Sequence, residues 1–177
     1  MRGFGNSLLA MGIAGFLAVV ACPGCKKSTA APPAPPPLYP GLPTAAQPKL
    51  PTTKLWVSTQ ELVSELAITG EQQQTGMMFR TNMAENEAML FVSPFPHRAS
   101  FWMMNTILPL SAAYIDPEGI ILEIHDLQPH DTNSVVASSD RIQFVLEVNQ
   151  GWFKRHNINT GMVIRAETGP LKQIGRR

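Results

Sequence analysis

The chain has 177 residues, of which 44% are hydrophobic and 15% charged, and only two of them are cysteines. Two cysteines are too few for a disulfide-stabilised scaffold. Residues 54–168 contain seven lysines and arginines and all thirteen acidic residues, a net charge of −6, which excludes a nucleic-acid partner because such binding depends on neutralising phosphates. The sequence contains no phosphate-binding loop, zinc-spaced cysteine set or nucleophile elbow, so we expect no cofactor and no metal.

Residues 1–21 are predicted to be an export signal. Arg2 supplies one positive charge, and an uncharged, mostly apolar run follows over residues 8–21. That run matches the core of a signal peptide, roughly 7 to 15 residues, and is shorter than the roughly 20 residues of a membrane-spanning helix. It ends in VVAC, which resembles the bacterial lipobox, whose cysteine is acylated and becomes the new N-terminus. We therefore predict a lipid on Cys22 and an extracytoplasmic, membrane-anchored protein, in the periplasm or at the cell surface.

Two other interpretations of this segment stay open. CPGC, at residues 22–25, has the spacing of a thioredoxin-like redox pair. Such a pair follows a strand and begins a helix, whereas here an export signal precedes it and prolines follow. The second alternative is a cleaved signal without lipid.

If the cell has two membranes, Pro23 after the acylated cysteine favours the outer one.

Residues 22–53 are predicted to be a proline-rich linker that carries the lipid at its start. Nine of the sixteen prolines lie in residues 28–53. Because proline fixes φ and lacks an amide donor, this stretch cannot pack as a helix or a central strand. We expect an extended spacer of up to ~80 Å. The alternative, a ligand for an aromatic groove, lacks a clear PxxP with a flanking charge.

The folded domain is predicted to span residues 54–168, and residues 169–177 to be a basic, flexible tail. Alternating apolar and polar residues along 61–68 and 141–148 indicate strands with one buried face. A last strand is expected at 162–167. The length of the domain, about 115 residues, is that of one ordinary domain with its own core.

A hairpin and two short helices complete the predicted elements. The sequence DPEG at 116–119 matches a type I turn, so strands 110–116 and 120–127 are expected to pair. Short helices are expected from Thr69 or Gly70 into EQQQTGMMF and within GWFKRHN. Together these elements predict a mainly β fold, a small antiparallel β-sandwich or barrel with one or two short helices.

The alternation of apolar and polar residues is least regular in the run FWMMNTILPL. Residues 99–105 are expected to form a strand with Phe101, Met103 and Asn105 on one face. Trp102 falls on the other face beside a methionine, where the two form either a second small core or the wall of a groove.

The domain contains, in this order, GMMFR, AMLFV, FWMMNTILPL, AYIDPEG, VLEVNQGWF and INTGMVI. This series resembles the DUF192 family, also named UPF0127, over residues 57–166. The resemblance implies a small, mainly β sandwich that is often exported, with no established biochemical role. Two residues depart from the family pattern: Met104 stands where the family has lysine, and Ser111 stands where it has aspartate. Their replacement lowers the expectation of catalysis and favours an apolar or aromatic contact near Met104.

The matched positions include four candidate ligand-binding residues: Arg80, Trp102, Asn105 and Glu147. Arginine can clamp a carboxylate, and asparagine can both donate and accept, so Arg80 and Asn105 are predicted to hold an anionic or amide-bearing small ligand against Trp102. The alternative is structural: Arg80 pairs with Glu147 or binds backbone carbonyls, and Asn105 satisfies a turn.

Two further groups of residues give weaker indications of a functional site. HDLQPHD at 125–131 combines imidazoles and carboxylates that suit a transition metal, but the spacing matches no known ligand pattern, and a polar loop is the commoner interpretation. Asp116 with Glu147 is a formal glycoside-hydrolase pair whose separation cannot be read from the sequence. We therefore predict a small-molecule or protein-binding module. The alternatives are an enzyme of hydrolase type with a site around Arg80 and Asn105, and a structural accessory lipoprotein.

Overall fold

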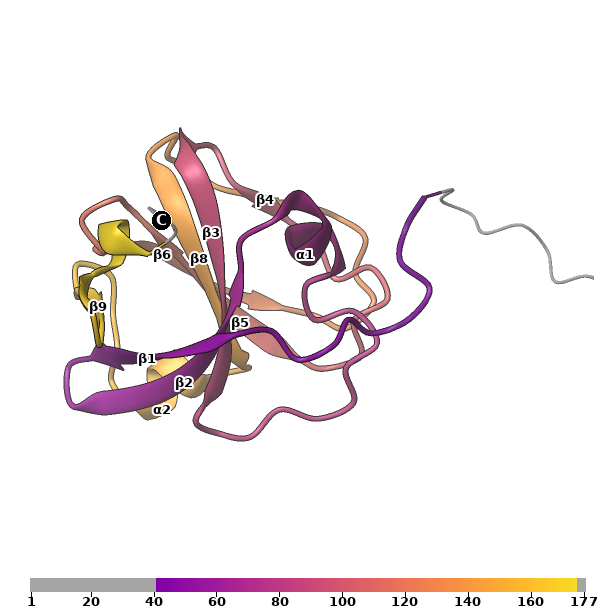
Figure 1. Cartoon of the computed structure of the whole chain (residues 1–177), viewed down its shortest axis with the longest axis horizontal. Helices are drawn as coiled ribbons and strands as arrows, with labels where there is room; N and C mark the ends of the chain where they lie inside the picture. The colour runs from indigo at the N-terminus through magenta and orange to yellow at the C-terminus, as the bar shows by residue number, and fades with distance from the viewer. Residues whose placement is uncertain (1–40, 175–177) are drawn as a thin grey trace, which may run out of the picture. The chain divides into compact units, whose positions relative to one another are not determined.

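The computed structural model describes residues 41–174, and these form a mainly β domain with two short α-helices, as predicted. Eight strands make one sheet in the order β10-β9-β1-β2-β3-β8-β5-β6, and β4 and β7 make a separate pair (Figure 1). The strands are β1 (Thr52–Val57), β2 (Gln60–Ala67), β3 (Glu87–His97), β4 (Ser100–Phe101), β5 (Leu110–Ile115), β6 (Ile121–Leu127), β7 (Val135–Val136), β8 (Ile142–Asn149), β9 (Ile164–Ala166) and β10 (Gly169–Pro170). The helices are α1 (Gly70–Thr75), α2 (Trp152–Arg155) and the 3-10 helix η1 (Leu171–Gln173).

The strand directions correct the expected antiparallel architecture at one position. β2 and β3 are parallel neighbours, whereas the other pairs in the described sheets are antiparallel. Parallel strands need a crossover connection, and here the segment with α1 supplies it. The large sheet does not close into a continuous ring: within residues 41–174, an isolated bridge between Ile120 and Val163 joins the β6 end to the segment before β9. A sandwich or barrel is therefore not confirmed.

The predicted hairpin of β5 and β6 is confirmed, together with its turn. The Gly119 amide donates to the carbonyl of Asp116 at 3.0 Å. One carboxylate oxygen of Asp116 accepts from the amides of Glu118 and Ile120 at 3.0 and 2.9 Å. Gly119 has φ of +88°, and a Cβ there would lie 2.5 Å from the carbonyl oxygen of Ile164. The turn therefore requires glycine both for its backbone conformation and for its close approach to β9.

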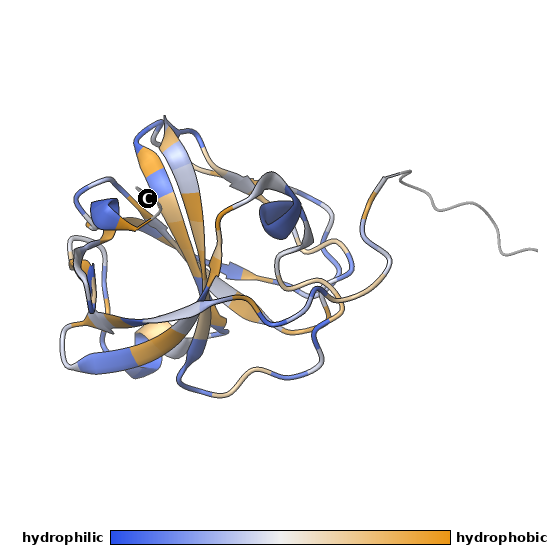
Figure 2. Ribbon diagram, in the orientation of Figure 1, coloured by the Kyte–Doolittle hydropathy of each residue, from blue (hydrophilic) through white to orange (hydrophobic). Residues whose placement is uncertain are grey.

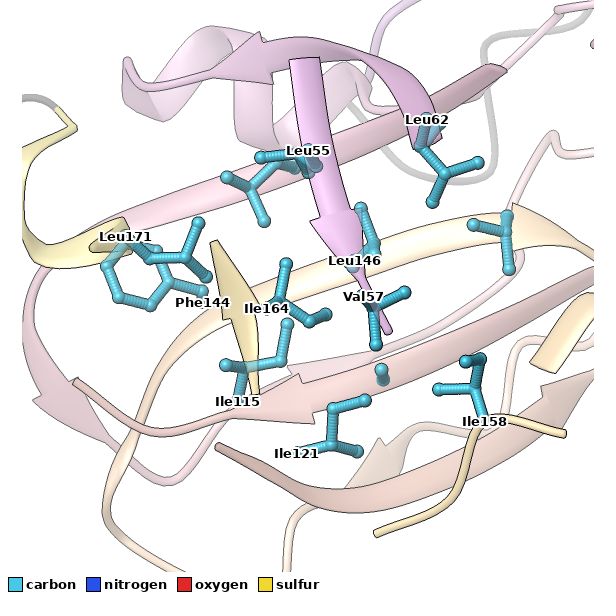
Figure 3. Packing of buried hydrophobic residues seen from close by; sticks show 14 of the residues in the cluster. Leu55, Val57, Leu62, Ile115, Ile121, Phe144, Leu146, Ile158, Ile164 and Leu171 are labelled. Carbon is cyan, nitrogen blue, oxygen red and sulfur yellow. The ribbon is translucent and has the colours of Figure 1, made fainter. Parts of the chain in front are cut away.

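Two apolar clusters lie on opposite faces of the central strands, because successive side chains of a strand point to opposite sides. We call them the first core and the second core. Figure 3 shows residues of the first core converging from β1, β2, β5, β6, β8, β9 and η1; they include Leu55, Val57, Leu62, Ile115, Ile121, Phe144, Leu146, Ile164 and Leu171. The second core includes Ala67, Met77, Met89, Phe91, Met103, Leu110, Ala112, Tyr114, Ile142 and Val145.

The central strand β8 is buried on both faces, which corrects the expectation of a single buried face. Leu146 belongs to the first core and Val145 to the second, while the carboxylic acid of Glu147 is also buried. β8 lies between β3 and β5, and apolar groups cover it from both sides. Figure 2 shows this inner part of the sheet largely in orange and the glutamine-rich helix α1 in blue.

Both ends of the described chain pack against the domain. On the N-terminal side, the Gln47 amide group donates to the carbonyls of Gln72 and Gly76 at 3.1 and 2.9 Å, and β1 begins at Thr52. On the C-terminal side, residues 169–173, expected as the start of a flexible tail, form β10 and η1, with Leu171 fully buried. Across residues 41–174, no helix has the length and apolar character that crossing a bilayer requires. The predicted signal and Cys22 lie outside the described residues.

Candidate functional site

The segment that follows β4 turns sharply instead of continuing as a strand. The Met103 amide donates to the carbonyl of Asp131 at 2.8 Å, and the Thr106 amide donates to the carbonyl of Met103 at 3.0 Å. Between them Asn105 has φ of +55°, a left-handed conformation that asparagine tolerates better than most residues. The prediction that residues 99–105 form one strand is therefore wrong beyond Phe101, and Asn105 does not share a strand face with Met103.

A pocket of about 390 Å³ lies on the second-core side, against this turn. Trp102 and Glu147, two of the four predicted ligand-binding residues, line it. Its apolar walls come from β3, β8, β4 with the residue after it, and the chain after α1, and they include Phe91, Val145, Phe101, Trp102, Met77 and Met78. Its polar lining includes Gln73, Gln74, Gln143, Thr106, Ser93 and Ser100, and its ionisable residues are Glu147 and His97.

Helix α1 forms one wall of the pocket, and local sequence fixes its position. Thr69 caps the helix, because its hydroxyl accepts from the Gln72 amide and the Gln72 side chain accepts from the Thr69 amide. Gln73 donates from its side chain to the carbonyl of Val92 on β3 at 2.8 Å. After the helix, Gly76 has φ of +45°, and a Cβ there would lie 3.1 Å from the ring of Phe91. The helix is therefore attached to β3 directly beside the pocket.

Glu147 is the unusual group of this pocket. It lies on β8 opposite Met89 of β3 and Ala112 of β5, and the residue is only 3% exposed. Its Oε2 atom has no hydrogen-bond partner among the described residues. Burial raises the pKa of this carboxyl from 4.5 to about 8, because removal from water disfavours the charged form. At neutral pH the side chain is therefore mainly the uncharged acid.

Arg80 does not reach the pocket, and its role here is structural. Its guanidinium donates to Oε2 of Glu65 at 3.0 Å and to the carbonyl of Pro48 at 3.3 Å. The side chains of Arg80 and Glu65 are only 13% and 14% exposed, and the same Glu65 oxygen accepts from the Leu50 amide at 2.7 Å. Arg80 therefore ties the segment before β1 to β2. The alternative that it pairs with Glu147 is wrong, whereas its contact with a backbone carbonyl is observed.

Asn105 also serves the backbone. Its carbonyl accepts from the amide of Phe79 at 2.9 Å, and Phe79 itself has φ of +60°. The side chain of Asn105 is absent from the residues that line the pocket. The structure therefore brings Trp102 and Glu147 to one cavity and places Arg80 at a second one, of about 340 Å³, beside Lys49 and Glu65. A hydrolase-type site that shares Arg80 and Asn105 is not assembled.

The side chains of His125 and Asp126 in HDLQPHD contact partners outside this run. His125 meets Glu123 at 3.0 Å on β6, and Asp126 accepts from the hydroxyl of Ser111. Ser111 in turn accepts from the Gly151 amide at 2.8 Å, so the residue that departs from the family pattern joins β5 to β6 and to the start of α2. Within residues 41–174, no three histidine, cysteine, aspartate or glutamate side chains come together as a metal site would require.

Asp116 is occupied by its turn and does not pair with Glu147. In addition to the two amides of the turn, its other oxygen accepts from Arg141 at 3.3 Å. Asp116 is also absent from the lining of the pocket that contains Glu147. The two carboxyl groups therefore do not form the pair that glycoside hydrolysis needs.

Comparisons with known proteins agree with the resemblance found in the sequence. The model of the DUF192 family, described as "Uncharacterized ACR", matches residues 53–166. A crystal structure from Sinorhizobium meliloti 1021, described as a candidate transcription regulator, is 29% identical with a TM-score of 0.65, covering 68% of this chain and 98% of that one. Another from Novosphingobium aromaticivorans DSM 12444, of unknown function, is 30% identical with a TM-score of 0.64, covering 68% and 91%. No curated protein matches the chain.

Proposed function

The chain belongs to the DUF192 family, and we propose that its domain binds a small molecule in the pocket lined by Trp102 and Glu147. One observation carries the proposal: Glu147 lines the cavity, its carboxyl is buried, and one of its oxygens has no partner within the described chain. An unpaired buried polar group costs about 1–3 kcal/mol. Such a group calls for an explanation, and a ligand that pairs with it supplies one.

The volume of the pocket fits this role, and polar and apolar side chains share its lining. Small-molecule sites typically enclose about 300–1,000 Å³, with mostly apolar walls and a few placed polar groups. A volume of about 390 Å³ lies at the lower end of that range and suits a compact ligand. Phe91, Phe101 and Trp102 supply flat apolar surface, and Glu147 supplies the polar group that would orient the ligand.

Binding can be tested by ligand-observed NMR with the purified full-length chain and a library of small cationic, neutral and anionic compounds. We expect compounds that bind the native chain and lose at least about tenfold in affinity with Trp102→Ala, the loss of one large aromatic contact. Trp56→Ala is the matched control, because Trp56 lies on β1 and lines a different cavity. If no compound of any charge binds, or if Trp102→Ala and Trp56→Ala weaken binding equally, the proposal is wrong.

We further propose that the domain is anchored outside the cytoplasm by a lipid on Cys22. The apolar run of residues 8–21, the lipobox-like VVAC and the proline-rich residues that follow support this proposal. Mass spectrometry of the chain expressed in a bacterium should find an N-terminal peptide that begins with acylated Cys22. Cys22→Ser should abolish the acyl mass. Recovery of a chain that still begins with Met1 from the cytosol would contradict the proposal.

The description of the Sinorhizobium relative as a candidate transcription regulator is not extended to this chain. Residues 54–168 carry a net charge of −6. A surface of that sign repels phosphates, whereas DNA binding depends on lysine and arginine contacts to the backbone.

A further inference from the structure

We infer that the pocket takes an organic cation, with the ligand's ammonium group set against Glu147 and the aromatic rings beside it. The inference rests on the proposed binding function and adds the charge class of the ligand. Three features of the pocket carry it: the absence of basic side chains other than His97 from its lining, the three aromatic rings, and the buried carboxyl of Glu147, one oxygen of which has no partner among the described residues.

The lining of the pocket selects against anions. No lysine or arginine contributes to it, and Glu147 is the acidic residue that does. Carboxylate and phosphate ligands are usually held by arginine or lysine, in charge-assisted hydrogen bonds. An anionic ligand would find no lysine or arginine partner in this lining, and it would be repelled by Glu147 whenever that carboxyl is ionised.

The aromatic residues favour a positive group. Phe91 and Phe101 meet edge to face, with ring centroids 4.8 Å apart, and Trp102 lines the same pocket. The face of an aromatic ring attracts a cation, by about 0.5–1 kcal/mol when exposed and about 2 kcal/mol when desolvated, and tryptophan is the best of the three ring types. Quaternary ammonium ligands are commonly recognised in this way.

Glu147 completes the site, because an ammonium ion would give its carboxyl the positively charged partner that the surrounding residues do not provide. Without a ligand, burial keeps the carboxyl mainly protonated at neutral pH, with a pKa of about 8. A cation placed beside it favours the carboxylate. Binding should therefore transfer the carboxyl proton to the solvent, so that a neutral acid and a cation become an ion pair and one released proton.

Two other titratable groups lie near this face of the sheet. His97, at the end of β3, lines the pocket and is exposed. Tyr114, on β5, donates its hydroxyl to the carbonyl of Val135 at 2.7 Å, and burial holds its pKa far above the ordinary value. Tyr114 therefore stays protonated at neutral pH, and His97 is the group that a pH experiment must control for.

The test uses three probes of one shape: choline, its neutral analogue 3,3-dimethylbutan-1-ol, and the anion 3,3-dimethylbutanoate. Choline carries a permanent charge, so its own protonation does not change with pH. Isothermal titration of the full-length chain at pH 6, 7 and 8 should show choline binding at least tenfold tighter than the other two. Its affinity should rise by up to tenfold per pH unit between pH 6 and pH 7 and level off near pH 8. Parallel titrations in buffers of different ionisation enthalpy should show close to one proton released per choline at pH 6.

Variants separate charge recognition from packing. Glu147→Gln should weaken choline binding at least tenfold and abolish its pH dependence, while the neutral probe changes by less than about twofold, because the amide keeps the shape of the acid. His97→Gln is the matched control and should retain the pH dependence. If this control loses it, or if the pH dependence survives in Glu147→Gln, the assignment to Glu147 is overturned.

The two proposals fail differently. If the neutral or anionic probe, or neutral or anionic library compounds, bind through Trp102 as tightly as cations do, the charge inference is wrong and the binding pocket stands. If no probe and no library compound binds the native chain, the binding function itself is wrong.

Discussion

Replacing Glu147 by glutamine is expected to stabilise the domain at neutral pH and to remove part of its pH dependence. The carboxyl is buried, and its pKa in the folded chain is about 8, against 4.5 for an ordinary glutamate. A raised pKa means that the folded state holds its proton more tightly than the unfolded state does. The stability that this protonation contributes is fully present below about pH 4.5 and is lost as the pH rises through about 8.

The magnitude follows from the width of this window. Each pH unit between 4.5 and about 8 changes the free energy of unfolding by about 1.4 kcal/mol, or about 5 kcal/mol over the whole window. Glutamine cannot ionise, so the variant lacks this loss. The free energy of unfolding of Glu147→Gln minus that of the native chain should therefore grow by about 3 kcal/mol between pH 5 and pH 7. The amide adds buried donors that cost about 1–3 kcal/mol if they stay unpaired, but this cost is the same at every pH.

Urea unfolding of both full-length chains at pH 5, 6, 7 and 8 measures the difference. Glu118→Gln is the control for removing one acidic group, because the side chain of Glu118 is 55% exposed at the β5–β6 turn. The slope of the difference with pH is the diagnostic quantity, since it does not depend on the cost of the amide. A difference between Glu147→Gln and the native chain that stays constant from pH 5 to pH 8 would refute the reasoning.

Substitutions at four further positions test the structural assignments by urea unfolding. Asn105→Ala should cost about 1 kcal/mol and Asn105→Gly should cost less, because φ is +55°; a better-tolerated alanine would contradict the turn. Arg80→Ala should cost about 2 kcal/mol, less than a fully buried pair because some exposure remains. In a chain that already carries Arg80→Ala, adding Glu65→Gln should lower the free energy of unfolding only slightly further. If the losses from the two substitutions are strictly additive, the two residues are not coupled. Gly119→Ala should cost at least ~2 kcal/mol, since its Cβ would approach the Ile164 carbonyl within 2.5 Å; unchanged stability would show that β9 moves freely.

The elements of the fold that depend on local sequence were predictable, and those that depend on distant partners were not. Alternation located β2 and β8, and DPEG located the hairpin of β5 and β6, because period and turn chemistry are properties of adjacent residues. The parallel pairing of β2 with β3 depends on where the chain returns after α1. The pattern of β8 suggested a solvent face at Glu147, because alternation records polarity but does not record what covers the strand.

For the candidate site, the family resemblance selected Trp102 and Glu147, which line one pocket, together with Arg80 and Asn105, which do not. Glu65, the partner of Arg80, looked like an ordinary polar position on a half-buried strand, so the sequence carried no sign of the pair. Asn105 did carry a usable sign, since asparagine is enriched in left-handed turns. The burial of Glu147 carried no such sign, because alternation placed it on the polar face of its strand and acids are almost never fully buried unless paired.

The pairing of β1 with β9 sets when this chain can fold during its synthesis. Among the described residues, β1 is the first strand and β9 is one of the last two, and Leu171, which follows β10, packs in the first core. A ribosome-bound chain that lacks these final residues would leave the edge of β1 unpaired and the core unfilled, and pairing over such a separation forms slowly. We propose above that this polypeptide crosses a membrane before it folds. A fold that is completed only when β9 and η1 have been synthesised suits that route, because the nascent chain is expected to stay unfolded until then.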